Sequence, residues 1–343
     1  MLLKNMGMFS SWYMFFFLLI MSVLMSMSCN SVLWVWLSME LNSMFFLPLL
    51  NSFNNFLNLE QMMKFFFIQS ISSSFLFFLI FFFYVSNNMN FFKMKSIFLM
   101  IMFLKMGTAP FHFWALHMME NFELMALLIF LTIQKLIPLT FIILNFDKLT
   151  MFVFSMLNSF FGSIMGLSQF SLKKMIMFSS LNHLSWILIS ISLSMKLFKF
   201  YIYLYFLMVF FQILFIKMNK ILFIYQIFFH LKNSVKPKFN KNNPLFFLMM
   251  YFMGLPPMIG FFPKFFIILK SNEFLTMIIL FMIFMTLMSF VFYTRMILTI
   301  LLNSIQMTKF LVIYNFKNKT LFYLNMFLVS MFMSFLFFFE KTI

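Results

Sequence analysis

The chain is a succession of long apolar runs separated by short polar connections. A membrane-spanning helix needs about 20 mainly apolar residues, and the sequence holds eleven such runs. The runs are continuous rather than alternating, which excludes the strands of a membrane β-barrel. The pattern predicts an all-α, polytopic membrane protein, with residues 1–343 forming one transmembrane domain. The predicted spans cover approximately residues 9–27, 32–50, 61–85, 96–118, 124–145, 150–168, 174–195, 199–216, 245–270, 274–301 and 321–339.

Helix-breaking residues gather in the fourth and ninth of these spans. The fourth contains FLKMGTAPFHFW, with Gly107 and Pro110 near its middle, and the ninth contains GLPPMIGFFPK. Proline removes a backbone hydrogen bond and clashes with the preceding turn, and in lipid the freed carbonyls need other partners. A packing kink is an adequate explanation for a single Gly-Pro pair. The denser run in the ninth span favours a discontinuous helix.

The fourth and ninth spans run in opposite directions, because they are five spans apart along the chain and five is an odd number. This predicts inverted five-helix repeats, with the first over about 9–216 and the second over about 245–339. A basic loop over 217–243 would join them, although its first part, to about 231, can also continue the eighth span. Paired discontinuous helices at corresponding positions indicate an ion path in transporter folds. No internal sequence identity is visible, so this prediction depends on the order of the spans alone.

The distribution of charge predicts the orientation in the membrane. The formal net charge is +17 with only 9% charged residues, and the mean hydropathy is +1.03. The lysines cluster between spans, so we interpret them as orientation signals rather than as a nucleic-acid surface. The N-terminal side carries Lys4, Lys173, Lys174, Lys217, Lys220, Lys232, Lys236, Lys238, Lys241, Lys309, Lys317 and Lys319. The opposite side carries fewer, namely Lys93, Lys95, Lys148, Lys196, Lys199, Lys270 and Lys341. The N-terminus is therefore expected on the positive-inside face.

The composition also limits the chemistry that the chain can carry. Cys29 is the only cysteine, so no disulfide within the chain and no cysteine-ligated cluster can form. No GxGxxG or P-loop pattern is present, so no nucleotide site is visible. Phe and Met are abundant while Ala and Arg are rare, which is typical of an AT-rich organelle genome.

Ionisable residues lie deep in several spans, where a charge costs a few kcal/mol and its presence indicates a function. Glu40, Lys105, Lys135 and His183 lie close to the centres of the second, fourth, fifth and seventh spans. His112 and Lys264 directly follow the two predicted breaks. Alternatively, Glu40 and Lys105 form one structural ion pair, and Lys264 snorkels to the interface. The remaining cations near span ends are expected to be interfacial anchors, namely Lys64, Lys173, Lys174, Lys217 and Arg295.

A buried Glu–Lys pair can act as a proton switch. While Glu40 is close to Lys105, the lysine keeps its proton; when Glu40 is drawn away, the proton can pass toward Lys135. Moving one charge against 100 mV costs about 2.3 kcal/mol. Water admitted at the helix breaks would complete the relay together with polar side chains, namely Gln69, Ser70, Gln134, Asn182 and His183.

The ordered motifs MELN, KMGTAPFHFW, TIQKLIP, SLKKMIMFSSLNHLSW and GLPPMIGFFPK resemble the subunit 2 family of mitochondrial NADH–ubiquinone oxidoreductase, respiratory complex I. The resemblance extends from about residue 30 to 270. It implies an antiporter-like, proton-pumping subunit of the membrane arm in the mitochondrial inner membrane, with its N-terminus in the matrix. By motif match it assigns the coupling glutamate to Glu40, the key lysine to Lys105, the central relay lysine to Lys135 and the exit-side lysine to Lys264. Thr108 departs from the family pattern, where a smaller residue is usual.

The resemblance also implies which groups lie elsewhere. NADH, FMN, the iron–sulfur clusters and ubiquinone would be bound by other subunits, with no cofactor in this chain. Its partners would be other membrane-arm subunits and the lipid bilayer, including cardiolipin, with no nucleic acid. Two other functions fit the same residues: a stand-alone cation/proton antiporter, and a scaffold whose buried charges only fix helix packing.

Overall fold

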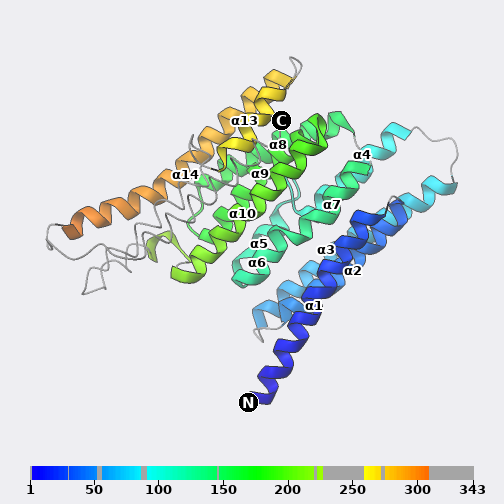
Figure 1. The fold of residues 1–343 in the computed structure, drawn as a ribbon, viewed down its shortest axis with the longest axis horizontal. Coiled ribbons are helices and arrows are strands. Elements are labelled where there is room, and N and C mark those ends of the chain that lie inside the picture. The colour runs from blue at the N-terminus through cyan, green and yellow to red at the C-terminus, as the bar shows by residue number, and fades with distance from the viewer. Residues whose placement is uncertain are drawn as a thin grey trace, which may run out of the picture. The chain divides into compact units, whose positions relative to one another are not determined.

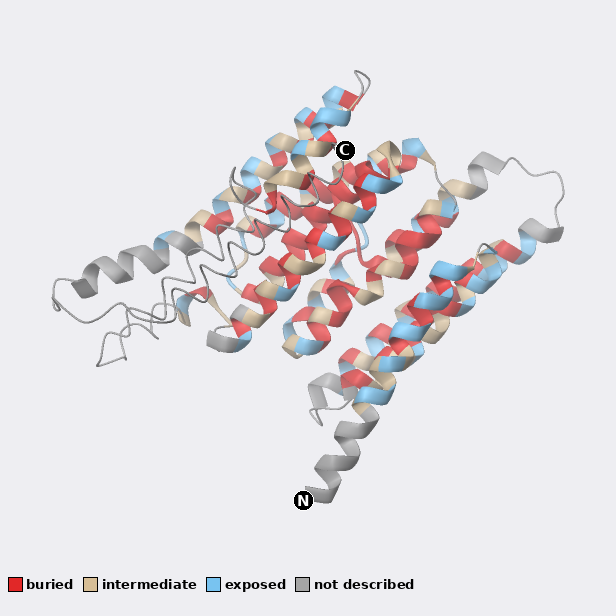
Figure 2. Cartoon of the chain, in the orientation of Figure 1, coloured by how far each residue is buried: buried red, intermediate tan, exposed pale blue. Residues whose placement is uncertain are grey.

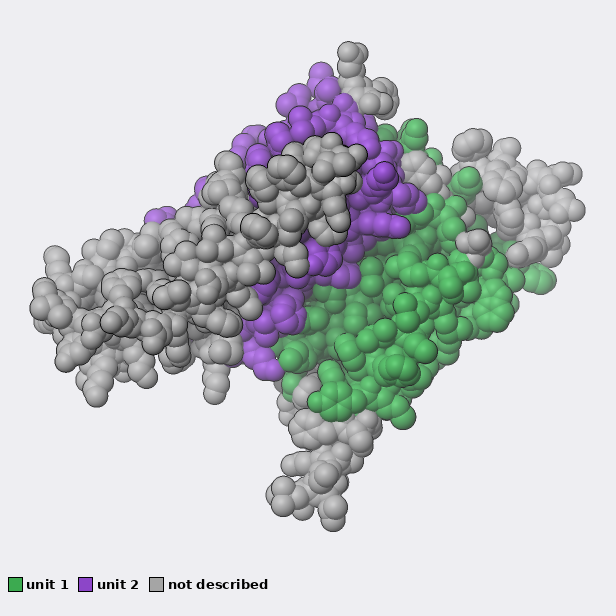
Figure 3. Space-filling model, in the orientation of Figure 1, with its two compact units in different colours: residues 1–158 green, residues 159–343 purple. Residues whose placement is uncertain are grey.

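The computed structural model describes residues 2–29, 31–51, 56–85, 91–144, 147–219, 222–226, 259–271 and 275–308. The chain forms two compact units, residues 1–158 and 159–343, which Figure 3 shows in different colours. Apart from an isolated bridge between Ser171 and Phe223, these ranges contain helices and no strands. The prediction of an all-α fold is therefore confirmed for the part of the chain that is described.

Unit 1 is a bundle in which one short helix contacts several longer ones (Figure 1). Helix α7 packs against α1, α2 and α4, and α2 also packs against α1 and α3. The unit contains α1 (Leu2–Ser28), α2 (Val32–Asn51), α3 (Phe56–Val85), α4 (Phe91–Met106), α5 (Phe113–Asn121), α6 (Leu124–Leu131), α7 (Ile133–Leu144) and the first half of α8 (Lys148–Leu167).

Unit 2 is built around a single enclosed helix. Helix α9 (Leu172–Leu193) packs against α10 (Met195–Asn219), α13 (Phe261–Lys270) and α14 (Thr276–Thr308). Nearly every position of α9 is buried, as Figure 2 shows by colour. A helix without an exposed face needs no amphipathic pattern, which explains why apolar and polar residues follow no clear helical period along α9.

Seven helical segments among the described residues are long and apolar enough to cross a membrane. Helices lie at each of the first eight predicted spans and at the tenth. The fourth span is divided into α4 and α5, as the sequence predicts, but the fifth is also divided, into α6 and α7. The first part of the ninth span and the whole eleventh span lie outside the described residues, so the total of eleven stays a prediction.

Serine hydroxyls inside these apolar helices bond to their own backbone. Ser38, Ser155 and Ser190 are buried, and each donates to the carbonyl three residues earlier at 2.7 Å. A hydroxyl without a partner in a medium free of water would cost several kcal/mol. These local bonds allow a serine to sit in a buried span without a partner on another helix.

Aromatic rings form the core of unit 1. Phe46 of α2 packs against Phe65 of α3, with ring centroids 5.2 Å apart, and Phe130 of α6 lies 6.4 Å from both. Trp114 of α5 joins the cluster edge-on to Phe130 at 5.8 Å. These contacts hold the short helices α5 and α6 against the long ones, beside the interruption that follows α4.

Candidate proton-relay site

The interruption after α4 is formed by a glycine in a left-handed conformation. Helix α4 ends at Met106, Gly107 has φ +64°, and α5 begins at Phe113. L-residues rarely adopt this conformation because their Cβ atom clashes with the backbone. Glycine lacks that atom, so Gly107 lets the chain leave the helix in the middle of an apolar run.

The carbonyl groups that this interruption frees are bonded to protein groups. The carbonyl of Phe103 accepts from the backbone N–H of Thr108 at 3.1 Å and from its hydroxyl at 3.0 Å. The carbonyl of Leu104 accepts from the N–H of Gly107 at 3.1 Å and from the indole Nε1 of Trp114 at 3.2 Å. Thr108 therefore caps α4.

Two side chains from other helices complete this closure. Gln69 of α3 donates from Nε2 to the carbonyl of Lys105 at 3.2 Å. Asn158 of α8 accepts at Oδ1 from the backbone N–H of Ala109 at 2.7 Å. Buried backbone groups in lipid need such partners. Protein groups supply them here, whereas the sequence suggested that water would.

Lys105 lies in the last turn of α4, directly before the interruption. Only 6% of its surface is exposed. Glu40 lies half-buried on α2 and acts electrostatically on Lys105, but the two side chains form no direct ion pair. The structure therefore places Glu40 and Lys105, the predicted switch residues, within electrostatic range of each other. They do not form the closed ion pair of the alternative interpretation.

His112 lies at the start of α5 and is fully buried. Its Nδ1 is 3.2 Å from the carbonyl oxygen of Pro110, and its ring stacks on Phe113 with centroids 4.4 Å apart. The interruption thus holds a titratable ring seven residues along the chain from Lys105.

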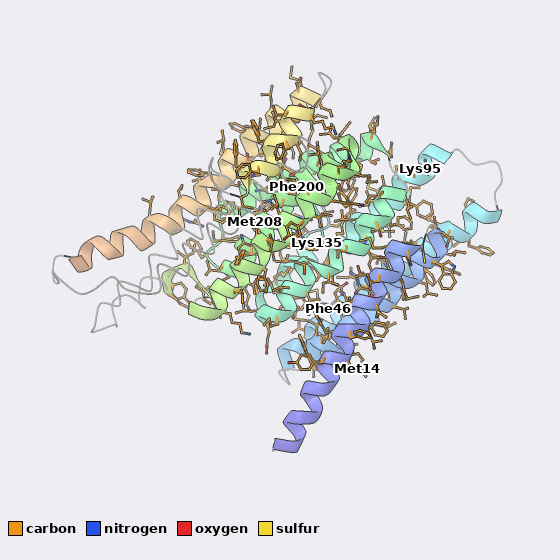
Figure 4. The ribbon with its side chains drawn as sticks, viewed as in Figure 1. Met14, Phe46, Lys95, Lys135, Phe200 and Met208 are labelled. Atoms are coloured by element: carbon orange, nitrogen blue, oxygen red, sulfur yellow. The ribbon has the colours of Figure 1, made fainter. Side chains whose placement is uncertain are left out.

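Lys135 follows a second interruption in unit 1. Helix α6 ends at Leu131, Thr132 has φ −112° and ψ −75°, and α7 begins at Ile133. Lys135 is the third residue of α7 and is 2% exposed; Figure 4 labels it among the helices of the bundle. The neighbouring Gln134 donates from Nε2 to Oδ1 of Asn42 on α2 at 3.4 Å.

Unit 2 contains the other two predicted site residues. His183 lies on α9 with 6% of its surface exposed. Lys264 lies half-buried on α13, four residues after Gly260, and α13 packs against both α9 and α10. The GLPP segment that precedes Lys264 lies outside the described residues.

The polar residues expected to carry water have different environments. Gln69 bonds to backbone, as described above, and Ser70 donates to the carbonyl of Phe67 in its own helix at 3.0 Å. Asn182 is buried beside Gly162, and neither polar atom of its amide has a hydrogen-bond partner among the described residues. Asn182 therefore differs from Gln69 and Ser70, whose side chains both bond to backbone carbonyls.

Sequence reasoning missed three features of the site. Thr132 interrupts the fifth span without a glycine or proline at that point, although Pro138 lies six residues later in α7. Asn158 supports the α4–α5 interruption from α8, and Tyr201 of α10 lies 3.2 Å from His183. In each case the sequence shows a polar or phenolic residue inside an apolar span. Such a residue indicates a buried polar group but does not identify its partner.

Comparison with solved structures supports the fold. The chain resembles a chain of respiratory complex I from Thermus thermophilus with a TM-score of 0.70, 16% identity and coverage of 84% of this chain and 70% of that one. It also resembles a chain of the Mrp complex from Dietzia sp. DQ12-45-1b, with a TM-score of 0.65, 11% identity and coverage of 82% and 58%. At these identities the likeness shows a shared helical architecture.

Comparison of sequences shows the family. The model described as NADH:quinone oxidoreductase/Mrp antiporter, TM, matches residues 29–292. The NADH-ubiquinone oxidoreductase chain 2 of Aedes aegypti is 33% identical over 318 residues, covering 90% of this chain and 91% of the relative. The protein of the same name from Anopheles gambiae is 31% identical over 316 residues, covering 89% and 90%. The chain therefore belongs to the NADH:quinone oxidoreductase/Mrp antiporter family and, within it, to the NADH-ubiquinone oxidoreductase chain 2 proteins of respiratory complex I.

Proposed function

We propose that this chain moves protons across the mitochondrial inner membrane as a membrane-arm subunit of complex I, driven by quinone reduction on other subunits. NADH, FMN, the iron–sulfur clusters and ubiquinone would be bound elsewhere in the complex. The excess of lysines on the N-terminal side supports an N-terminus in the matrix. The proposed relay consists of Glu40, Lys105, Lys135, His183, Lys264 and His112.

The observation that carries the proposal is the placement of two buried lysines, each beside an interrupted helix. Lys105 lies at the C-terminal end of α4 and Lys135 in the first turn of α7. The partial negative charge at a helix C-terminus stabilises a cation, while the N-terminus disfavours one, by about 0.3–1 kcal/mol and up to about 2 in buried settings. Because α4 and α7 pack together, a proton passing from Lys105 to Lys135 would lose the stabilisation that the C-terminal end of α4 gives it.

This stabilisation of the proton on Lys105 is strengthened or weakened by the position of Glu40. With its carboxylate near Lys105, the proton is held on Lys105 and does not leak toward α7. When the carboxylate is withdrawn, Lys105 loses that stabilisation and transfer to Lys135 becomes less costly. A movement of Glu40 tied to quinone chemistry would therefore set the moment of transfer. In the last part of the proposal, the proton continues from Lys135 to the relay residues His183 and Lys264.

The division into inverted repeats over about 9–216 and 245–339 is part of this proposal. The discontinuous fourth span supports the first repeat, and we assign Lys264, which follows Gly260, to the proposed break of the second. The resemblance to the Mrp complex favours one second candidate, a stand-alone cation/proton antiporter. Reconstitution of the purified chain alone in liposomes separates the two, because an antiporter would exchange ions without its complex.

The decisive experiment is substitution of Lys135 by methionine in the assembled complex in proteoliposomes. Methionine has a similar length and removes the cost of keeping a charge buried, so we expect normal assembly. Loss of a proton-transfer group is expected to lower pumping at least about tenfold. Lys148→Met is the matched control, because Lys148 is exposed at the start of α8. Normal assembly with unchanged pumping in Lys135→Met would favour a structural scaffold instead.

A further inference from the structure

In unit 2, a phenol from α10 meets the histidine of α9. The Nδ1 atom of His183 lies 3.2 Å from the hydroxyl oxygen of Tyr201, within hydrogen-bond distance. Tyr201 is fully buried, and His183 is 6% exposed. The tautomer of the imidazole decides which group donates, so the pair can exchange donor and acceptor roles.

A second phenol continues the contact one helical turn further along α10. The ring of Tyr205 lies 5.7 Å from that of His183, and the ring of Tyr201 lies 6.2 Å from it. Residues four apart on one helix share a face. The two phenol rings of α10 therefore lie on the face that meets His183 of α9.

We propose that the Tyr201 hydroxyl is a further proton-transfer group of this subunit, which exchanges protons with His183. The proposal rests on the proposed function, because it extends the relay through His183. No assignment by motif or by family resemblance includes Tyr201.

The transfer conserves protons without a charged phenol. Protonated His183 gives its Nδ1 proton to the Tyr201 oxygen as the Tyr201 hydroxyl gives its own proton to a water molecule. One N–H bond and one O–H bond break while two O–H bonds form, the positive charge leaves on that water as hydronium, and the imidazole and the phenol both end neutral. Ionising a phenol this deep in protein would be costly, so a concerted exchange through neutral hydroxyls is the favoured route.

Tyr201→Phe in the assembled complex tests the proposal, because it removes only the hydroxyl and keeps the ring. We expect normal assembly and a fall in pumping of about tenfold or more. Tyr203→Phe is the matched control, since Tyr203 lies on the same helix with 47% of its surface exposed. Proton uptake is measured with a pH-sensitive dye in proteoliposomes, in H₂O and in D₂O. Pumping by Tyr201→Phe within twofold of the wild type would overturn the proposal.

A second pair of variants separates proton transfer from structural support. Tyr201→His keeps a group that can both donate and accept a proton, whereas Tyr201→Gln can hydrogen-bond but relays protons poorly. Better pumping by the histidine variant supports the proposal, and equal pumping by the two contradicts it. This comparison also applies if Tyr201→Phe does not assemble.

Substitution of His183 distinguishes this inference from the proposed function. If His183→Gln loses pumping while Tyr201→Phe keeps it, the relay stands and the role of Tyr201 is wrong. If His183→Gln also pumps normally, the relay through unit 2 is wrong, and the inference fails with it.

Discussion

Replacing Gly107 by alanine tests the origin of the α4–α5 interruption. A Cβ atom at this position would lie 2.8 Å from the Cβ of Ala115 and 3.2 Å from the indole ring of Trp114. The Cβ of Ala115 is attached directly to the backbone of α5 and cannot rotate away. The substitution must therefore shift α5 relative to the end of α4.

Two costs add up in this variant. The left-handed conformation costs an L-residue about 1–2 kcal/mol, and an extra methyl group in a packed interior costs about 1–3 kcal/mol. The expected loss of stability is about 2–5 kcal/mol. If Trp114 moves, its bond to the Leu104 carbonyl is also lost, and the end of α4 opens next to Lys105.

The assay is thermal unfolding of the purified complex, together with the amount of complex that assembles. Gly166→Ala is the matched control, because Gly166 lies inside helix α8 and its new Cβ would meet mainly the ring of Phe292 at 3.0 Å. We expect Gly107→Ala to lower the apparent Tm clearly more than Gly166→Ala does. Equal unfolding temperatures for the two variants would refute the explanation of the interruption given above.

Three further outcomes are expected. Glu40→Gln should keep assembly but lower coupled turnover, measured as NADH oxidation and proton uptake together; full activity would contradict the switch. Asn158→Leu should lower the stability of the folded chain by about 1–3 kcal/mol, because it leaves the buried N–H of Ala109 without its acceptor. Asn158→Asp keeps that acceptor, and the unfolding temperatures of the two variants are compared. Arg295→Lys should destabilise the end of α8, because the guanidinium of Arg295 donates to the carbonyls of both Leu167 and Gln169. A single ammonium lacks the planar fork needed to reach both carbonyls. Limited proteolysis of the membrane-embedded complex measures how readily the end of α8 unfolds.

The spans and the buried charges could be predicted from the sequence because both are local properties. A run of apolar residues long enough for the bilayer is visible without knowledge of any contact. The interruption at Gly107 is also a local signal, since Gly107 and Pro110 lie three residues apart and both disfavour a continuous helix. The burial of Lys105 and Lys135 follows from their positions near the centres of their spans.

The partners of these groups could not be predicted, because they are long-range. Asn158 bonds to a backbone group 49 residues earlier, and Tyr201 meets a histidine 18 residues earlier. Neither spacing leaves a periodic signal in one sequence. The interruption at Thr132 was missed for another reason: a β-branched residue is only mildly unfavourable in a helix, and packing around α7 decides its conformation.

The closure of the α4–α5 interruption has a consequence for biosynthesis. The backbone N–H of Ala109 has its acceptor on α8, which leaves the ribosome about 50 residues after the GTAP segment. During translation this donor enters the bilayer before its acceptor exists, so the segment must wait at the insertion machinery or at the interface. We therefore expect nascent chains truncated before residue 158 to remain susceptible to protease or crosslinker near Gly107, and longer chains to become resistant.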